Sequence, residues 1–200
     1  MKKSALVLAL AWGAALSFVG SAQQPSEDGP RYRNATSLIR PVDYREWTFL
    51  SSGLGMTYED SSASQRPQQA APPTFGNVFV NPSSYRSFMQ TGKWPDKTIF
   101  ILEVRTSGSD ASINKAGRFQ TGLAALEAEV KDSRFPDGWA FFNFGPARSM
   151  KDVAEPLSGQ AAAPCVDCHT KHTAAERTFV QFYPTLLEAA RQKGTLKAGF

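Results

Sequence analysis

Four side chains that can bind a metal or form covalent bonds lie within eight residues of this chain. They are Cys165, Cys168, His169 and His172, and they include every cysteine and every histidine of the 200-residue sequence. The first three form the pattern C-x-x-C-H, which is the attachment sequence for a c-type haem. Two thiols at this spacing can form thioethers with the porphyrin vinyl groups, and the adjacent imidazole can then bind the iron. The cluster therefore predicts one covalently bound haem c.

Three other interpretations of the cluster agree less well with the sequence. A structural zinc site needs four ligands, usually in two separated pairs, and no cysteine or histidine exists outside residues 165–172. A redox C-x-x-C normally occurs near a βαβ pattern, whereas an Ala- and Pro-rich run precedes this one. A disulfide between the two cysteines stays open, but it gives His169 no role.

The second axial position of the iron has no distinctive ligand in the sequence. His172 stands three residues after His169, which is too close for it to reach the opposite face of the iron. Electron-transfer cytochromes commonly use a methionine there, and Met56, Met89 and Met150 follow the N-terminal segment. Met89 fits the packed face of a helix, so Met56 and Met150 are the alternatives. We expect instead an open position that accepts a small ligand.

The N-terminal segment has the composition of a secretory signal peptide. Lys2 and Lys3 precede an apolar run from Ala5 to Gly20, and small residues suit cleavage after Ala22. A membrane anchor is the alternative, but the run is short and lacks a basic flank on its far side. Export puts the cysteines in an oxidising compartment, where free thiols do not persist. We therefore expect residues 1–22 to be removed and the protein to be periplasmic, with no membrane attachment.

The composition suits a single domain. Hydrophobic residues make up 42% and aromatic residues 12% of the sequence, which is enough for a core in a chain of this length. The formal net charge of +4 falls to +2 once Lys2 and Lys3 are lost, and so weak a balance does not indicate nucleic-acid binding. Polar, Pro-containing stretches at residues 23–37 and 61–74 are predicted to be a loose leader and a surface loop. The domain is expected to span residues 38–200.

Short strands and marginal helices are predicted to position the cysteine cluster. Helices are expected from Pro82 to Gly92, and from Thr185, as the cap, to Gly194. Residues 123–130 alternate only partly, so that either a strand or a helix fits them. The remaining runs rich in β-branched and aromatic residues are predicted strands, at residues 77–80, 98–105, 139–144 and 177–184. Together these elements predict an α+β domain built on an antiparallel sheet.

Several blocks of the sequence, in this order, resemble the cytochrome P-460 family, which includes the cytochromes c′-β. They are NVFVNPSSYRSFMQTGKW, GKWPDKTIFILEVR, VKDSRFPDGWAFFNFG and CVDCH…TFVQFYPTLLEAARQKGTLK, and they extend over most of residues 38–200. The resemblance implies a small exported protein with a β-rich fold, commonly a homodimer. It also implies a five-coordinate haem whose only protein ligand is His169.

One lysine separates the two branches of this family. In the cytochromes P-460 proper, a strand lysine is linked to the porphyrin and the enzyme oxidises hydroxylamine. In the cytochromes c′-β the link is absent, and the haem binds nitric oxide in an apolar pocket capped by phenylalanine. The resemblance places this lysine at Leu102, and the sequence has no lysine from Thr98 to Val104; Lys93 and Lys97 precede the strand. Gas binding is therefore expected, with hydroxylamine oxidation or electron transfer as alternatives, and enzymatic activity stays undecided.

Alternation along this strand puts Phe100, Leu102 and Val104 on one face. If that face meets the haem, the distal pocket is apolar and lacks a general base. We therefore expect Phe100 and Leu102 to line the distal pocket, and we regard Phe79 of the preceding strand as a further residue of its cap. Plain core packing explains the same alternation without a cofactor.

Overall fold

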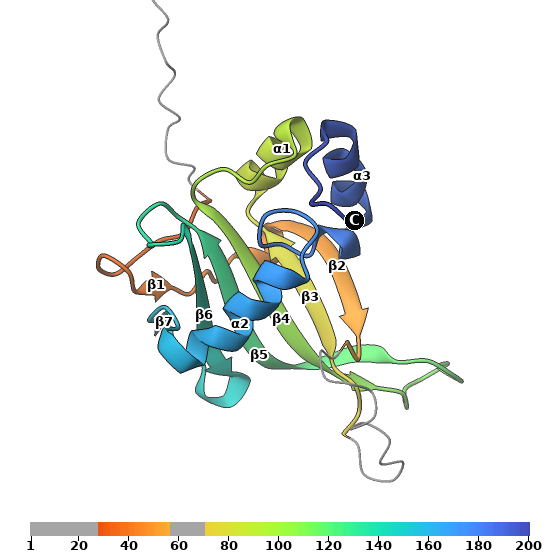
Figure 1. The fold of residues 1–200 in the computed structure, drawn as a ribbon. Coiled ribbons are helices and arrows are strands. Elements are labelled where there is room, and N and C mark those ends of the chain that lie inside the picture. Colours follow the sequence, from red (N-terminus) through yellow and green to blue (C-terminus); the bar gives the residue numbers. More distant parts are fainter. Residues whose placement is uncertain (1–27, 57–70) are drawn as a thin grey trace, which may run out of the picture.

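A five-stranded antiparallel sheet forms the framework of the structure, a computed structural model that describes residues 28–56 and 71–200 (Figure 1). Strands that are consecutive in the sequence are neighbours in this sheet. They are β2 (Thr48–Leu54), β3 (Phe75–Val80), β4 (Thr98–Gly108), β5 (Phe119–Lys131) and β6 (Trp139–Pro146). With helices at its margins, this sheet confirms the predicted α+β fold class.

Three helices accompany the sheet: α1 (Pro82–Thr91), α2 (Gly159–Lys171) and α3 (Pro184–Lys193). α1 and α3 pack together at one end of the sheet, whereas α2 crosses one of its faces (Figure 1). Both α1 and α3 begin with proline, which has no N–H to leave unpaired in a first turn. They end at Gly92 and Gly194, which adopt the left-handed conformation that stops a helix. Thr185 is not the cap of α3, because Pro184 before it already begins the helix.

The remaining elements are short. β1 (Leu38–Ile39) pairs with β7 (Val153–Ala154), and single 3-10 turns form η1 (Tyr44–Glu46), η2 (Ala147–Ser149) and η3 (Val180–Phe182). The prediction of a strand at residues 177–184 is wrong, because η3 and its flanks occupy this segment. Its backbone bonds are local, as in the bond from Tyr183 N–H to the Val180 carbonyl. The Gln181 side chain binds the backbone before this segment, which holds it in a turn.

Residues 123–130, which fitted either a strand or a helix, belong to β5 and make up most of its C-terminal part. Alanine, leucine and glutamate favour helices when a segment stands alone. Here β4 and β6 pair with β5 on its two sides, so ladder hydrogen bonds along both edges determine its conformation. The tertiary pairing overrides the local preference.

The two faces of the sheet bury separate apolar clusters. On β4, Ile99 and Ile101 point to one face, where they pack with Phe79 and Phe142. Phe100 points to the other face, toward α1, α3 and the segment after α2. The second face is the one that α2 crosses, and it positions the site described below.

The chain from residue 28 to residue 37 is held against the domain and is not a loose leader. The Tyr32 hydroxyl donates to Asp132 at 2.9 Å, and the Arg134 guanidinium lies 3.8 Å from the Tyr32 ring centre. Arg134 also donates to the Ala35 carbonyl at 2.7 Å. Asp132 and Arg134 both lie in the turn between β5 and β6. The contacts with them therefore hold the segment against the domain.

Two expectations concern parts of the chain outside the described residues. The predicted signal peptide at residues 1–22 lies there, as does most of the predicted loop at residues 61–74. Within residues 28–56 and 71–200, no helix has the length and apolar character needed to cross a membrane.

Candidate functional site

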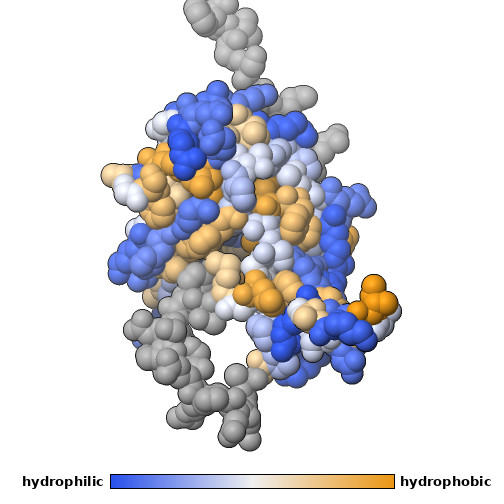
Figure 2. All heavy atoms as spheres, turned by 90° about the vertical axis from the view of Figure 1, so that its right-hand side faces the viewer, coloured by the Kyte–Doolittle hydropathy of each residue, from blue (hydrophilic) through white to orange (hydrophobic). Residues whose placement is uncertain are grey.

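A cavity of about 420 Å³ lies between α2 and the sheet face that α2 crosses. All five strands of the sheet contribute to its wall, and Phe179, Phe182 and Tyr183 close it from the segment after α2. Its volume falls in the range of cofactor and ligand pockets, roughly 300–1000 Å³. Apolar residues also gather at the surface on the side of β2 and α3 (Figure 2).

α2 brings the C-x-x-C-H motif to this cavity. Cys165 and His169 stand four residues apart, so that they lie on the same side of the helix, and both line the cavity. Cys168 packs against the apolar cluster beside it. His172 follows the last residue of α2 and is exposed. The structure therefore brings three of the four clustered residues together and leaves His172 outside.

The surroundings of the two thiols do not favour their ionisation. Burial raises the pKa of Cys165, and the nearby Glu127 carboxyl raises it further. Burial also raises the pKa of Cys168, with a further contribution from Asp167. A redox C-x-x-C needs a lowered thiol pKa, because the thiolate is the attacking species. These shifts count against a thiol–disulfide exchange site.

The His169 ring is fixed in orientation. Its Nδ1 lies 2.8 Å from the Arg177 carbonyl oxygen, and because a carbonyl only accepts hydrogen bonds, Nδ1 carries the hydrogen. Phe141 and Phe179 hold the ring with edge contacts, at centroid distances of 4.8 and 4.7 Å. The other nitrogen, Nε2, is thereby the one that can bind a metal, as in histidine ligands oriented by a hydrogen bond at Nδ1.

β4 supplies the apolar wall of the cavity. Phe100, Leu102 and Val104 all line it, as the alternation of the strand indicates. Phe79 does not reach it, because the preceding strand turns this residue to the opposite face. There Phe79 packs edge-on against Tyr44, with ring centres 5.5 Å apart.

β5 adds two carboxyl groups to the cavity that were not among the residues expected there from the sequence. Glu127 pairs with Leu102 and Glu129 pairs with Phe100 in the ladder between β4 and β5, and both glutamates line the cavity. Burial raises the pKa of each, although the nearby His169 opposes the shift. A strand assignment for residues 123–130 would have revealed them, since alternation places both on one face. The cavity is therefore apolar along β4 but carries two carboxyl groups along β5, so the expectation that it lacks a general base is wrong.

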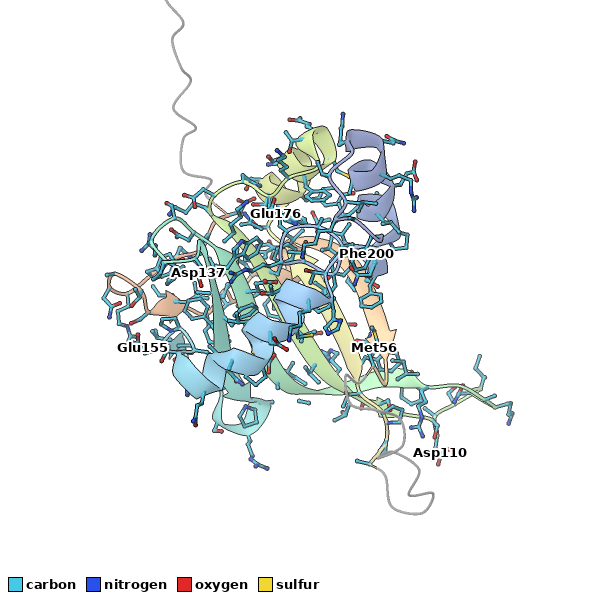
Figure 3. The ribbon with its side chains drawn as sticks, in the orientation of Figure 1. Met56, Asp110, Asp137, Glu155, Glu176 and Phe200 are labelled. Carbon is cyan, nitrogen blue, oxygen red and sulfur yellow. The ribbon has the colours of Figure 1, made fainter. Side chains whose placement is uncertain are left out.

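Of the methionines considered as iron ligands, Met56 lines the cavity. It follows β2 (Figure 3), and 50% of its surface is exposed. Met150 packs against the core on the opposite face of the sheet, and Met89 packs in the cluster around α1 and α3. The described part of the chain thus offers one methionine at the cavity, at its open edge.

Within the described residues, no lysine lines the cavity. Lys97, in the turn before β4, forms ion pairs with Asp96 and Asp132. Lys93 is exposed at the end of α1. Leu102 occupies the place on β4 where the resemblance puts the cross-linking lysine, and its side chain has no amine.

In a comparison with protein families, the model of the cytochrome P460 family matches residues 41–180. The chain belongs to the cytochrome P460 family. Membership implies a c-type haem cytochrome, and the matched range includes the C-x-x-C-H motif and all five strands of the sheet. No curated protein matches the chain.

The cavity suits the haem that membership of the cytochrome P460 family implies. Cys165 and Cys168 stand three residues apart on one helix, as two thioether links to one porphyrin require. His169 presents Nε2 while the Arg177 carbonyl holds Nδ1. The apolar β4 wall faces these residues across the cavity. These residues would hold the haem.

Proposed function

We propose that this cytochrome P460 family member binds one haem c through Cys165 and Cys168, with His169 as its only protein ligand. We further propose that it binds nitric oxide or a related small ligand, as the cytochromes c′-β do. The observation that supports this best is the wall of Phe100, Leu102 and Val104 in the cavity of His169. No lysine stands on that wall, so a cross-linked porphyrin is not expected.

The residues of the chain have separate tasks in this proposal. A bound haem would supply an iron that can bind nitric oxide, and ferrous haem does so strongly without help from a distal hydrogen bond. Cys165 and Cys168 would fix the porphyrin to α2. The Arg177 carbonyl and two phenylalanine rings hold His169 in one orientation. The apolar side chains of β4 exclude water and offer no hydrogen bond to stabilise bound dioxygen.

Hydroxylamine oxidation is the second candidate function, and Glu127 favours it. Oxidation of hydroxylamine releases protons, and a carboxylate in the cavity can accept them. The absence of a lysine from the described cavity wall counts against this function, because the enzymes of the family have the cross-link. Electron transfer with Met56 as sixth ligand is a third candidate.

Export to the periplasm forms part of the proposal. Residues 1–22 have the pattern of a signal peptide, and haem attachment would protect thiols that an oxidising compartment does not leave free. The exported protein would then bind its ligand outside the cytoplasm.

Optical spectroscopy of the purified protein separates the three candidates. We expect a haem that resists acid-acetone extraction, a mass increased by one haem, and a five-coordinate, high-spin ferrous spectrum. The ferrous protein should bind nitric oxide and carbon monoxide, with negligible hydroxylamine turnover. A red-shifted band of a cross-linked porphyrin with steady turnover would favour the enzyme, and a low-spin six-coordinate spectrum would favour the electron carrier. A mature protein without haem, made in a host that matures c-type cytochromes, would overturn the proposal.

A further inference from the structure

A buried carboxyl group lies against the histidine proposed to bind iron. Glu129 stands near the C-terminal end of β5, between Phe100 of β4 and Phe141 of β6. Its Oε1 is 3.1 Å from Nδ1 of His169. The contact comes from two elements far apart in the sequence, since His169 lies on α2.

Oε1 of Glu129 has no well-formed hydrogen bond within the described residues. The distance to Nδ1 of His169 is short enough for one, but the hydrogen on Nδ1 points to the Arg177 carbonyl at 2.8 Å. Buried polar atoms almost always have partners, so a buried oxygen in this position calls for a specific reason. The position of Oε1 beside His169 offers such a reason. A single N–H can be shared between two acceptors, here the Arg177 carbonyl and Oε1 of Glu129.

A carboxylate beside a metal-bound histidine alters how strongly that histidine donates electrons to the metal. A histidine that donates its second N–H to a carboxylate becomes a more basic ligand, and its ring orientation is fixed. In haem proteins the strength of the axial ligand sets the reduction potential and the reactivity of the iron. A peptide carbonyl alone, such as that of Arg177, is a weaker acceptor than a carboxylate.

We propose that Glu129 is a positioning residue for the haem, which accepts the Nδ1 hydrogen of His169 together with the Arg177 carbonyl and so strengthens the iron–histidine bond. This inference rests on the proposed function, because it requires His169 to bind the haem iron. With Glu129 as a second acceptor, His169 would donate more electron density to the iron than a histidine whose Nδ1 hydrogen is bonded to a peptide carbonyl alone. The ferric state is then stabilised, and the reduction potential is lowered.

Glu127 provides a matched control for this inference. It lies two residues before Glu129 on the same face of β5, lines the same cavity and has the same carboxyl group. Its Oε1 is 3.5 Å from the Asn143 amide nitrogen, and it forms no ion pair with His169 within the described residues. E127Q therefore makes the same chemical change in the same cavity without touching the Nδ1 contact.

The test compares E129Q, E129D and E127Q as haem-loaded, full-chain proteins. Resonance Raman spectra of the ferrous state measure the iron–histidine stretch, and redox titration measures the potential. We expect E129Q to lower the stretching frequency and raise the potential, E129D to recover part of both changes, and E127Q to leave the frequency unchanged. An unchanged frequency in E129Q, or an equal change in E127Q, would overturn the inference.

A measurement on the unaltered protein keeps the inference testable if E129Q fails to fold or to load haem. The iron–histidine stretch of the unaltered protein should lie at the higher frequencies of histidines bonded to carboxylates. A frequency typical of histidines bonded only to peptide carbonyls would contradict the role of Glu129. A protein without haem would instead refute the proposed function, so the two failures are distinguishable.

Discussion

The spacing of single side chains decides what chemistry this cavity can perform. Cys165 and His169 share one side of α2, and Cys168 lies one position before the histidine, beside the same cavity. Burial raises the pKa of both thiols, so their surroundings do not favour the thiolate that a redox C-x-x-C needs. In the proposed function the two cysteines therefore serve as attachment points for the haem.

Removal of one attachment point should weaken the haem link without abolishing it. We predict that Cys168→Ala retains haem through Cys165, with one vinyl group left unreacted, because each thiol forms its own thioether. The spectrum of the pyridine haemochrome should shift to longer wavelength, and mass spectrometry should still find one haem. His172→Ala is the control, since His172 is exposed beyond α2, and its spectrum should equal that of the unaltered protein. A haem free of the chain in Cys168→Ala would contradict two independent links.

The sheet depends on a buried polar cluster on the face opposite the cavity. Glu103 of β4 is 2% exposed and accepts hydrogen bonds from Tyr44, Arg45, Asn77 and Arg105. Burial alone raises its pKa, but these bonds outweigh burial and lower the pKa to about 2. The cluster therefore ties η1 and β3 to the middle of the sheet.

Loss of this charge should destabilise the fold in a pH-dependent way. A folded pKa of about 2 lies below the unfolded value of 4.5, so the stabilisation is present above pH 4.5 and is lost as the pH falls toward 2. The shift corresponds to about 3 kcal/mol. We predict that Glu103→Gln lowers the free energy of unfolding at pH 7 by about 2–4 kcal/mol, because it leaves two arginines without their partner. Urea unfolding at pH 7 and pH 3 should show a smaller acid loss in the variant.

A surface ion pair supplies the control for this experiment. Asp152 pairs with Arg40, but its side chain is 81% exposed. Asp152→Asn should change the unfolding free energy by less than about 1 kcal/mol. An equal loss in both variants would mean that the buried cluster contributes no more than a surface pair.

The sequence predicted correctly those helices and strands whose ends or faces depend on neighbouring residues in the chain. Proline and glycine mark the ends of α1, and alternation along residues 98–105 gives the cavity-facing side of β4. The sequence did not reveal the carboxyls of β5, because residues 123–130 become a strand only through pairing with both neighbours. It also misassigned residues 177–184, where η3 is held by contacts with the end of α2. The motif predicted which residues would hold a haem, but the contact between His169 and Glu129 became visible only in the fold.

At the scale of the whole molecule, several large apolar side chains are exposed. The hairpin between β4 and β5 projects beyond the other strands, with Asp110 in its loop (Figures 1 and 3). Ile113, in the same loop, is 90% exposed, and Phe49 and Leu54 of β2 are exposed as well. A contiguous exposed apolar patch can mark a surface that meets another protein. Together with the family resemblance, these exposed side chains favour a homodimer.

We predict that the mature protein is a dimer at micromolar concentration and that the hairpin contributes to the dimer interface. Ile113→Glu should weaken the dimer at least tenfold, because burial of a new charge in an apolar contact is costly. Lys115→Glu is the control in the same exposed loop and should have a much smaller effect. Size-exclusion chromatography with light scattering over a concentration series gives both dissociation constants. A monomer of the unaltered protein throughout that series would refute the dimer, and equal effects of the two substitutions would place the interface away from Ile113.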